Sequence, residues 1–171
     1  LDAKGITHPF PIQALTLPVA LEGQDIIGQA TTGTGKTLGF GIPLLMDTLG
    51  PGGEGWDEDP ASGSPQAVVI LPTRERAKQV AEELSTAAAK RTVRIVQVYG
   101  GRAYEPQIED LERGAEVVVG TPGRLIDPME RGVLELAPVP TVVLDEAHEM
   151  LDLGFLPAVQ QSLATNRHHR P

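Results

Sequence analysis

The sequence predicts an α/β domain in which helices cover both faces of a parallel β-sheet. Four short runs rich in β-branched residues, at 67–71, 93–98, 117–119 and 142–144, are each separated from the next by enough chain for a helix. Continuous apolar runs that alternate with helices are typical of parallel strands buried on both faces. A glycine-rich segment at 29–37 adds a second observation. It stands between an apolar run and a helical one, which is the setting of a phosphate-binding loop.

The first predicted elements lead into and out of this glycine-rich segment. A helix is expected at 12–21, because apolar residues recur there on one face after a proline-punctuated opening. The apolar run 25–28 is predicted to be the strand before the loop. Residues 37–49 are predicted to form a buried helix, which Pro43 bends.

Residues 50–65 interrupt the regular pattern. They hold five glycines, three prolines and four acidic residues, with little to bury. We expect a flexible, acidic surface insertion and assign it no function. Trp56, the only tryptophan of the chain, is the side chain that could dock this insertion on the body.

The remaining chain supplies the other helices of the sheet. They are predicted at 74–89, 104–113, 123–131 and 147–164. In an open parallel sheet, ligands bind outside the carboxyl ends of the strands. The residues that directly follow the strands are therefore the candidates for a functional site.

Composition limits the class of protein. The length of 171 residues suits one domain with a substantial core, and 40% hydrophobic with 22% charged residues is ordinary for a globular chain. The absence of cysteine excludes disulfides and thiolate metal sites and is compatible with a reducing cytoplasm. No apolar run reaches the length of a membrane span and the first residues lack a signal-peptide pattern, so we expect a cytoplasmic protein that does not associate with membranes.

The charge is unevenly distributed. A net charge of −9 argues against binding nucleic acid by bulk electrostatics. Residues 1–73 hold two basic and eight acidic residues, whereas residues 74–131 hold ten of each. Most of these basic side chains are explained by solvated helix faces balanced by neighbouring glutamates.

The glycine-rich segment predicts a nucleotide site. Its glycines allow backbone N–H groups to point inward, and the helix that follows offers its positive end to phosphate. Lys36 is placed to reach the β- and γ-phosphates, and the Thr37 hydroxyl to bind Mg²⁺. The strict motif has glycine where Ala30 stands, but Gly35-Lys36-Thr37 is intact. The predicted phosphate-binding residues are Ala30, Thr31, Thr32, Gly33, Thr34, Gly35, Lys36 and Thr37.

Two adjacent carboxylates follow the last strand. Asp145 and Glu146 would be costly at the end of an apolar strand unless a cation or hydrogen bonds compensate them. In a phosphate-binding fold, an aspartate here holds Mg²⁺, generally through water, and the next glutamate orients and deprotonates the water that attacks the γ-phosphate. An exposed helix start enriched in acids is the simpler explanation, which the separate phosphate-binding loop disfavours. Lys36, Asp145 and Glu146 are therefore the predicted catalytic residues, with Thr37 and Asp145 as metal ligands.

Three other strand ends carry groups suited to a phosphate chain. Each has an ordinary structural explanation, since Thr73 and Thr121 are good helix N-caps, Pro122 suits a first helical position and the glycines turn the chain. Together they would offer helix N-termini, backbone N–H groups and arginines along one sheet edge. These candidates are Pro72, Thr73, Arg74, Gly100, Gly101, Thr121, Pro122, Gly123 and Arg124.

One residue near the N-terminus has the chemistry to read a base. The amide of Gln13 combines a donor and an acceptor, which complement the amino group and N7 of adenine. Taken alone, Gln13 is better explained as a solvent-facing helix residue.

Placed in order, these residues resemble the first RecA-like domain of a DEAD-box (DEAD/DEAH) ATP-dependent RNA helicase. The resemblance covers nearly the whole chain, from about Lys4 to Leu156. Residues 5–13 resemble the Q motif, whose glutamine reads adenine, 30–37 resemble motif I, and 145–148 resemble motif II. Residues 72–75, 100–101 and 121–124 resemble motif Ia, the GG element and motif Ib. The resemblance implies that these three segments contact the RNA backbone, and that ATP and Mg²⁺ are the cofactors.

Several positions depart from the family pattern. His148 replaces the final aspartate of motif II, at a position that normally contacts motif III, and we expect it to affect coupling between the ATP and RNA sites. Ile6 stands where an aromatic residue commonly packs near the base, and Arg76 replaces the usual leucine of motif Ia.

The resemblance also implies elements beyond this chain. The sequence stops about where the family begins the strand that leads to motif III, which lies between the strands of motifs I and II. We expect an N-terminal domain, 1–171, that is truncated before this strand, and a second RecA-like domain in the complete protein. The fragment alone is expected to bind nucleotide weakly, with little turnover.

The predicted function is an ATP-dependent RNA helicase domain that binds ATP-Mg and one side of single-stranded RNA. The complete protein would couple ATP binding and hydrolysis to local duplex unwinding. Two alternatives stay open: a non-catalytic, nucleotide-dependent RNA clamp or scaffold, and a DNA-directed superfamily 2 helicase.

Overall fold

Four parallel strands form one sheet in the computed structural model, which describes residues 5, 7–31, 33–58, 63–136, 139–155, 157 and 160. The strands lie in the order β2-β3-β1-β4. Their bounds are Ala67–Ile70 for β1, Ile95–Val98 for β2, Val117–Gly120 for β3 and Thr141–Leu144 for β4. In register, Val69 of β1 lies between Val119 of β3 and Val143 of β4. The predicted parallel sheet is confirmed, and all four strands fall on the predicted runs.

Six α-helices and one short 3₁₀ helix accompany the sheet in the described residues. They are α1 (Pro11–Leu21), α2 (Lys36–Asp47), η2 (Trp56–Glu58), α3 (Arg74–Ala87), α4 (Tyr104–Glu112), α5 (Pro122–Glu130) and α6 (Ala147–Asp152). The helix predicted at 147–164 is interrupted: α6 ends at Asp152, Gly154 takes φ +75° and turns the chain, and Pro157 and Gln160 are again helical. Most of the residues after Phe155 lie outside the described part.

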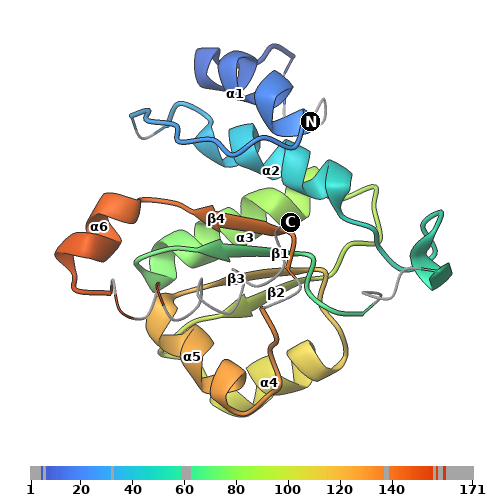
Figure 1. The fold of residues 1–171 in the computed structure, drawn as a ribbon, viewed down its shortest axis with the longest axis vertical. Helices are drawn as coiled ribbons and strands as arrows, with labels where there is room; N and C mark the ends of the chain where they lie inside the picture. The colour runs from blue at the N-terminus through green and yellow to red at the C-terminus, as the bar shows by residue number, and fades with distance from the viewer. Residues whose placement is uncertain are drawn as a thin grey trace.

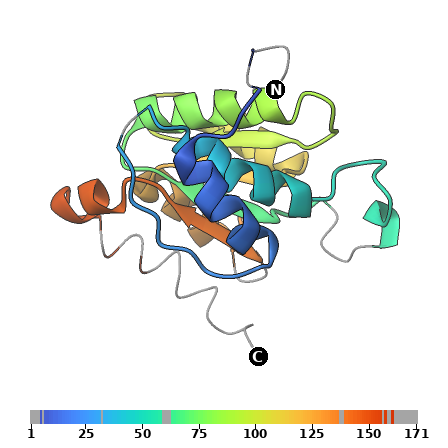
Figure 2. The same ribbon diagram turned by 90° about the horizontal axis from the view of Figure 1, so that it is seen from above.

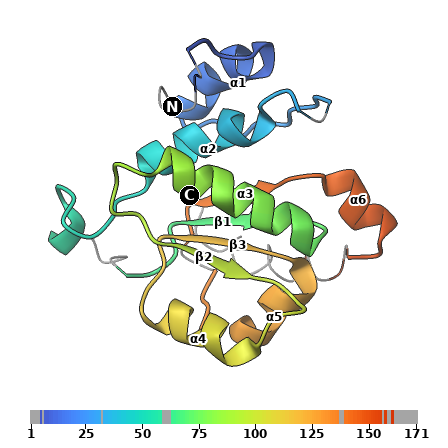
Figure 3. The same cartoon turned by 180° about the vertical axis from the view of Figure 1, so that it is seen from behind.

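Helices cover both faces of the sheet, as predicted. Successive side chains of β1 point to opposite faces. Val69 packs with α2 and α3 in one apolar cluster, and Val68 packs with Leu111 of α4 and Leu125 of α5 in a second one. Figure 1 shows α4 and α5 below the sheet and α2 above it, and Figure 3 shows α3 lying along the sheet from behind. The carboxyl ends of all strands consequently meet at one edge.

The strand predicted at 25–28 is the clearest error. The segment is not part of the sheet, and the side chains of Ile26 and Ile27 are exposed, that of Ile27 fully. A parallel strand requires a hydrogen-bonding neighbour. Within the described residues β4 pairs only with β1, so its outer edge is open, and no strand lies beside 25–28. Figure 2 shows this N-terminal part of the chain running outside the sheet.

The insertion at 50–65 is held to the body at two points. The Thr92 hydroxyl donates a 2.5 Å hydrogen bond to the carbonyl of Pro51. The ring of Trp56 lies 5.8 Å from the Arg94 guanidinium, which confirms that Trp56 docks on the body. The described residues of the insertion are mostly exposed, whereas 59–62 lie outside the described part. Its flexibility stays a prediction.

No helix in the described part of the chain is long and apolar enough to cross a bilayer.

Candidate functional site

The phosphate-binding loop precedes α2 as predicted. Gly33 and Gly35 take φ of +81° and +77°, values that glycine adopts without strain. Gly35 is the residue that opens α2, so the positive end of this helix faces the loop. The Thr34 hydroxyl donates a 2.6 Å hydrogen bond to the carbonyl of Thr31, and Thr37 is buried. Ala30 is half-buried beside the loop, and Thr32 lies outside the described residues.

Gln13 fastens this loop to the N-terminal segment. Its side chain is buried, contrary to the solvent-facing placement considered above. Its Oε1 accepts a hydrogen bond from the backbone N–H of Phe10, and its Nε2 donates to the carbonyl of Gly35. Both polar groups that could read a base are therefore bonded within the chain. A cavity of about 180 Å³ adjoins this place, lined by Thr7, His8, Pro9, Gln13, Leu17, Leu38 and Ile42.

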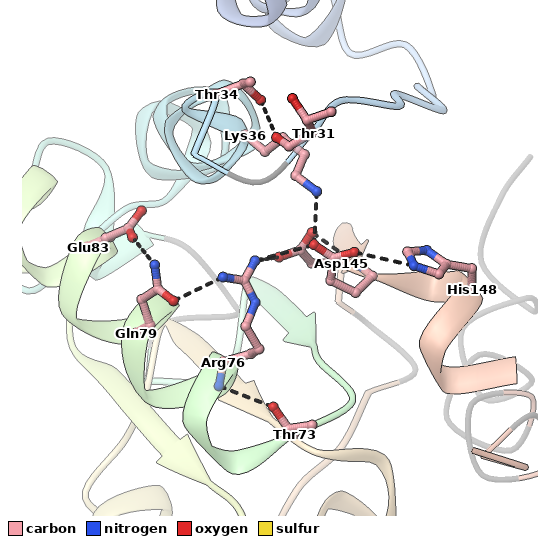
Figure 4. Close-up of polar contacts among 10 residues, drawn as sticks. Thr31, Thr34, Lys36, Thr73, Arg76, Gln79, Glu83, Asp145 and His148 are labelled. Carbon is pink, nitrogen blue, oxygen red and sulfur yellow. Dashed lines mark hydrogen bonds and ion pairs between the residues drawn. The ribbon is translucent and has the colours of Figure 1, made fainter. Parts of the chain in front are cut away.

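The phosphate-binding loop and the acidic pair come together in space. The ammonium group of Lys36 lies 2.9 Å from Oε1 of Glu146, although the two residues are 110 positions apart. Figure 4 shows the Lys36 side chain extending from the loop toward the carboxylates at the end of β4. This contact brings Lys36 of the loop to the acidic pair, while the roles of these residues stay predictions.

The pKa values of the two carboxyls are shifted in opposite directions. Burial raises the pKa of Asp145, the Glu146 charge adds to this rise, and Lys36 and Arg76 partly offset it. The hydrogen bond from Lys36 lowers the pKa of Glu146 against the opposing effect of burial. Asp145 is 7% exposed, so its charged form depends on cations nearby.

Glu146 has an unusual backbone conformation. Its φ of +54° and ψ of +45° place it in the left-handed region, and no other non-glycine residue in the described part has positive φ. Such a conformation costs about 1 kcal/mol or more and recurs at functional sites. Glu146 lies at the junction where β4 ends and α6 begins. Its left-handed backbone conformation therefore determines the direction in which its carboxylate points.

Asp145 at this junction and Thr37 at the start of α2 suit a hard cation bound together with phosphate. Asp145 supplies a buried carboxylate and Thr37 a hydroxyl, both oxygen ligands of the kind Mg²⁺ prefers. In the described residues, no group of three histidine, aspartate or glutamate side chains could hold a metal by itself. A metal here would therefore need water, phosphate oxygens or both to complete its coordination.

His148 lies at the rim of this site. Its side chain is largely exposed, and its Nε2 is 3.7 Å from Oε2 of Glu146. It is thus next to the acidic pair, while its role in coupling stays a prediction.

A second hollow collects the other strand ends. A cavity of about 530 Å³ is lined by Pro72, Arg74, Glu75, Gly100, Gly101, Thr121, Gly123, Arg124 and Phe155. Three predicted segments that are far apart in the sequence therefore share one surface. Two predicted members have structural positions instead. The Thr73 hydroxyl accepts the N–H of Arg76 as a helix cap, and Pro122 is buried at the start of α5.

Two features of these sites were missed from the sequence. Phe155 lines the larger cavity, and no pattern in the sequence singled it out. The contact of Arg76 with both carboxylates was also missed, although Arg76 had been noted as an unusual residue in its motif. Both depend on tertiary contacts between elements that no local periodicity relates.

Comparison with known proteins agrees with this arrangement. The sequence model described as DEAD/DEAH box helicase matches residues 10–170. The chain is 44% identical over 164 residues to the DEAD-box ATP-dependent RNA helicase CshA of Geobacillus kaustophilus, covering 96% of this chain and 33% of that protein. It is 45% identical over 161 residues to DEAD-box ATP-dependent RNA helicase 5 of Oryza sativa subsp. japonica, covering 94% of this chain and 31% of that one.

Solved structures of similar fold give the same picture. A DEAD box protein from the hyperthermophile Methanococcus jannaschii superposes with a TM-score of 0.84 at 38% identity, over 96% of this chain and 42% of that one. A hypothetical ATP-dependent RNA helicase from Sulfolobus tokodaii gives a TM-score of 0.83 at 33% identity, over 97% of this chain and 46% of that one. The chain thus spans about a third of the length of these curated relatives.

Proposed function

Because this chain belongs to the DEAD/DEAH box helicase family, we propose that it is the ATP-binding domain of an ATP-dependent RNA helicase. The observation that carries the proposal is the 2.9 Å contact between Lys36 and Glu146, which brings the phosphate-binding loop to the acidic pair. A lysine that binds phosphate and a glutamate that activates water must both be within reach of the same γ-phosphate.

Each residue of the site has a part in this chemistry. The loop N–H groups and the start of α2 bind the phosphates, and Lys36 leaves Glu146 to contact the β- and γ-phosphates. Glu146 then orients the attacking water and accepts its proton. The Lys36 contact lowers the pKa of Glu146, so the departure of Lys36 toward the phosphates makes this carboxylate a stronger proton acceptor.

Asp145 and Thr37 are proposed to hold Mg²⁺ with the triphosphate. The bound metal supplies neutralisation of the charge on the phosphate oxygens. The buried position of Asp145 supports this assignment, since a cation would offset its desolvation. The cavity beside Gln13 and Leu38 is the proposed place of the adenine base. For Gln13 to read the base, at least one of its present hydrogen bonds must be exchanged.

The larger cavity is the proposed contact surface for the RNA backbone. Arg74 and Arg124 supply positive charge there, and the glycines at 100–101 and 123 allow close approach of a phosphate chain.

We further propose that a fifth strand lies between β4 and 25–28 in the complete protein. The open edge of β4 and the exposed apolar side chain of Ile27 support this, because in the described residues β4 pairs only with β1 and Ile27 is not buried. A second RecA-like domain and a cytoplasmic location stay predictions.

The test uses the full-length protein and measures RNA-stimulated ATP hydrolysis and nucleotide binding separately. Glu146→Gln is expected to reduce turnover by at least about a hundredfold while nucleotide still binds. Lys36→Ala is expected to weaken nucleotide binding itself. Glu149→Gln, an exposed glutamate of α6, is the matched control and should leave both unchanged. Unchanged turnover in Glu146→Gln would refute the assigned role.

Measurements on the same full-length protein also distinguish two alternative functions. A nucleotide-dependent RNA clamp would bind ATP and RNA without RNA-stimulated turnover, and the ion pairs of Arg76 with the acidic pair give this alternative some support. A DNA-directed helicase would prefer single-stranded DNA over RNA in a competition with ATP present.

A further inference from the structure

Arg76 spans the gap between α3 and the acidic pair. Its NH2 lies 3.5 Å from Oδ2 of Asp145 and 3.4 Å from Oε1 of Glu146, so one guanidinium contacts both carboxylates. The side chain is 23% exposed. Figure 4 shows Arg76 reaching from the first turn of α3 to the end of β4.

Neighbours on α3 hold Arg76 in this position. Its NH1 donates a 2.9 Å hydrogen bond to Oε1 of Gln79, and Nε2 of Gln79 donates one of the same length to Oε1 of Glu83. The backbone N–H of Arg76 is bonded to the hydroxyl of Thr73, which caps the helix. The Arg76 side chain is thus held by the helix cap at its backbone, by Gln79 at NH1, and by the two carboxylates at NH2.

The contact supplies a counter-charge that the acidic pair needs. Asp145 is buried, and a buried carboxylate without a cation is costly. Lys36 engages Glu146, and Arg76 is the cation that reaches Asp145 as well. Arg76 thus contacts Asp145, the carboxylate that is proposed to hold magnesium. A magnesium ion at Asp145 and the Arg76 guanidinium would repel each other at this distance. Metal binding at Asp145 therefore requires Arg76 to move away, or it is weakened by the repulsion.

We propose that Arg76 is a positioning residue that competes with Mg²⁺ for Asp145 and thereby raises the magnesium concentration needed for nucleotide binding. This inference rests on the proposed nucleotide site. If Arg76 instead contacted the phosphates, it would strengthen nucleotide binding. Its removal would then weaken nucleotide binding and raise the magnesium concentration needed for it.

The first experiment measures binding of a fluorescent ATP analogue to the full-length protein as the magnesium concentration is varied. Arg76→Gln is expected to lower the half-saturating magnesium concentration by about three- to tenfold, because one positive charge leaves the site. Arg76→Lys keeps the charge and should stay close to the wild type. Lys78→Gln removes a charge from the same helix at an exposed position, where Lys78 pairs with Glu82, and should leave the half-saturating magnesium concentration unchanged. An unchanged or raised half-saturating concentration in Arg76→Gln would overturn the proposal.

The second experiment uses Mn²⁺ alone, without nucleotide, and follows water-proton relaxation. Arg76→Gln should bind Mn²⁺ more tightly than the wild type, and adding Asp145→Asn should abolish the gain. Equal Mn²⁺ binding by the wild type and Arg76→Gln would contradict the competition. If the wild type and Lys36→Ala both fail to bind nucleotide, the proposed function fails, whereas the Mn²⁺ comparison still decides the role of Arg76. Thermal unfolding of each variant confirms that it is folded.

Discussion

The side chain of Gln13 joins the N-terminal segment to the phosphate-binding loop through the carbonyl of Gly35. The Nε2–O distance is 2.9 Å, and the other end of the amide accepts the N–H of Phe10. A Cβ placed on Gly35 would lie 2.3 Å from Nε2 of Gln13, so the contact also requires glycine at position 35. The shape of the loop thus depends on a residue 22 positions away.

Removing this link should weaken the nucleotide site. Gln13→Ala leaves the Phe10 N–H and the Gly35 carbonyl without their partner, which costs about 1–3 kcal/mol. We expect a lower thermal unfolding midpoint and at least about a fivefold loss of affinity for an ATP analogue, measured by fluorescence titration. Gln24→Ala, at an exposed position, is the control. Wild-type affinity in Gln13→Ala would show that the loop does not depend on this link.

Opposite pH effects are expected from the two carboxyls of the acidic pair. The folded-state pKa of Asp145 is raised above its usual 3.8, so its ionisation opposes folding increasingly as the pH rises through and above that value. The folded-state pKa of Glu146 is lowered from 4.5, so its ionisation favours folding above that value, and this contribution is lost as the pH falls through the folded pKa.

At pH 7, Asp145→Asn should therefore raise the thermal unfolding midpoint of the nucleotide-free protein, and Glu146→Gln should lower it. Shifts of about 2–4 °C correspond to about 1 kcal/mol for a domain of this size. Repeating the scans near the usual pKa of Asp145 should shrink the gain of Asp145→Asn. A lower midpoint for Asp145→Asn at pH 7 would mean that Arg76 and Lys36 more than offset its burial.

The arginines of the larger cavity should contribute to RNA affinity through charge. Arg74→Ala and Arg124→Ala are each expected to weaken binding of single-stranded RNA and to reduce the slope of log affinity against log salt by about one. Fluorescence anisotropy over a range of salt concentrations measures both. Arg113→Ala removes an exposed arginine at the C-terminal cap of α4, outside the cavity, and should keep the wild-type slope. An undiminished slope in both cavity variants would exclude phosphate contacts by these residues.

Glu116 is predicted to be important for stability at the opposite end of the sheet from the site. It is fully buried, accepts hydrogen bonds from the backbone and guanidinium of Arg94, and raises the pKa of that guanidinium. Glu116→Gln should lower the free energy of unfolding by about 2–4 kcal/mol, because it leaves a partly buried charge without its partner. Urea unfolding measures the change. Glu112→Gln, exposed on α4, is the matched control, and an equal loss in both variants would contradict a special role for Glu116.

Local patterns in the sequence were sufficient for most of the fold. The β-branched runs predicted every strand of the observed sheet, because a strand buried on both faces must be apolar throughout. Gly35-Lys36-Thr37 and Asp145-Glu146 were identified for the same kind of reason: phosphate and magnesium chemistry restricts which residues can stand at a strand end. Their meeting at 2.9 Å also required α2 to pack against the sheet, because the loop before α2 does not follow a strand of the observed sheet.

Tertiary structure decided what no local pattern contains. Whether 25–28 forms a strand depends on a neighbouring strand, and in the described residues no strand of the sheet lies beside it. The bonding of Gln13 to Gly35, the entry of Phe155 into the larger cavity and the reach of Arg76 to Asp145 each join elements that are distant along the chain. The amino-acid sequence by itself determined which chemical groups stand at the ends of the strands. Packing determined which of those groups touch, since contact depends on how the helices lie against the sheet.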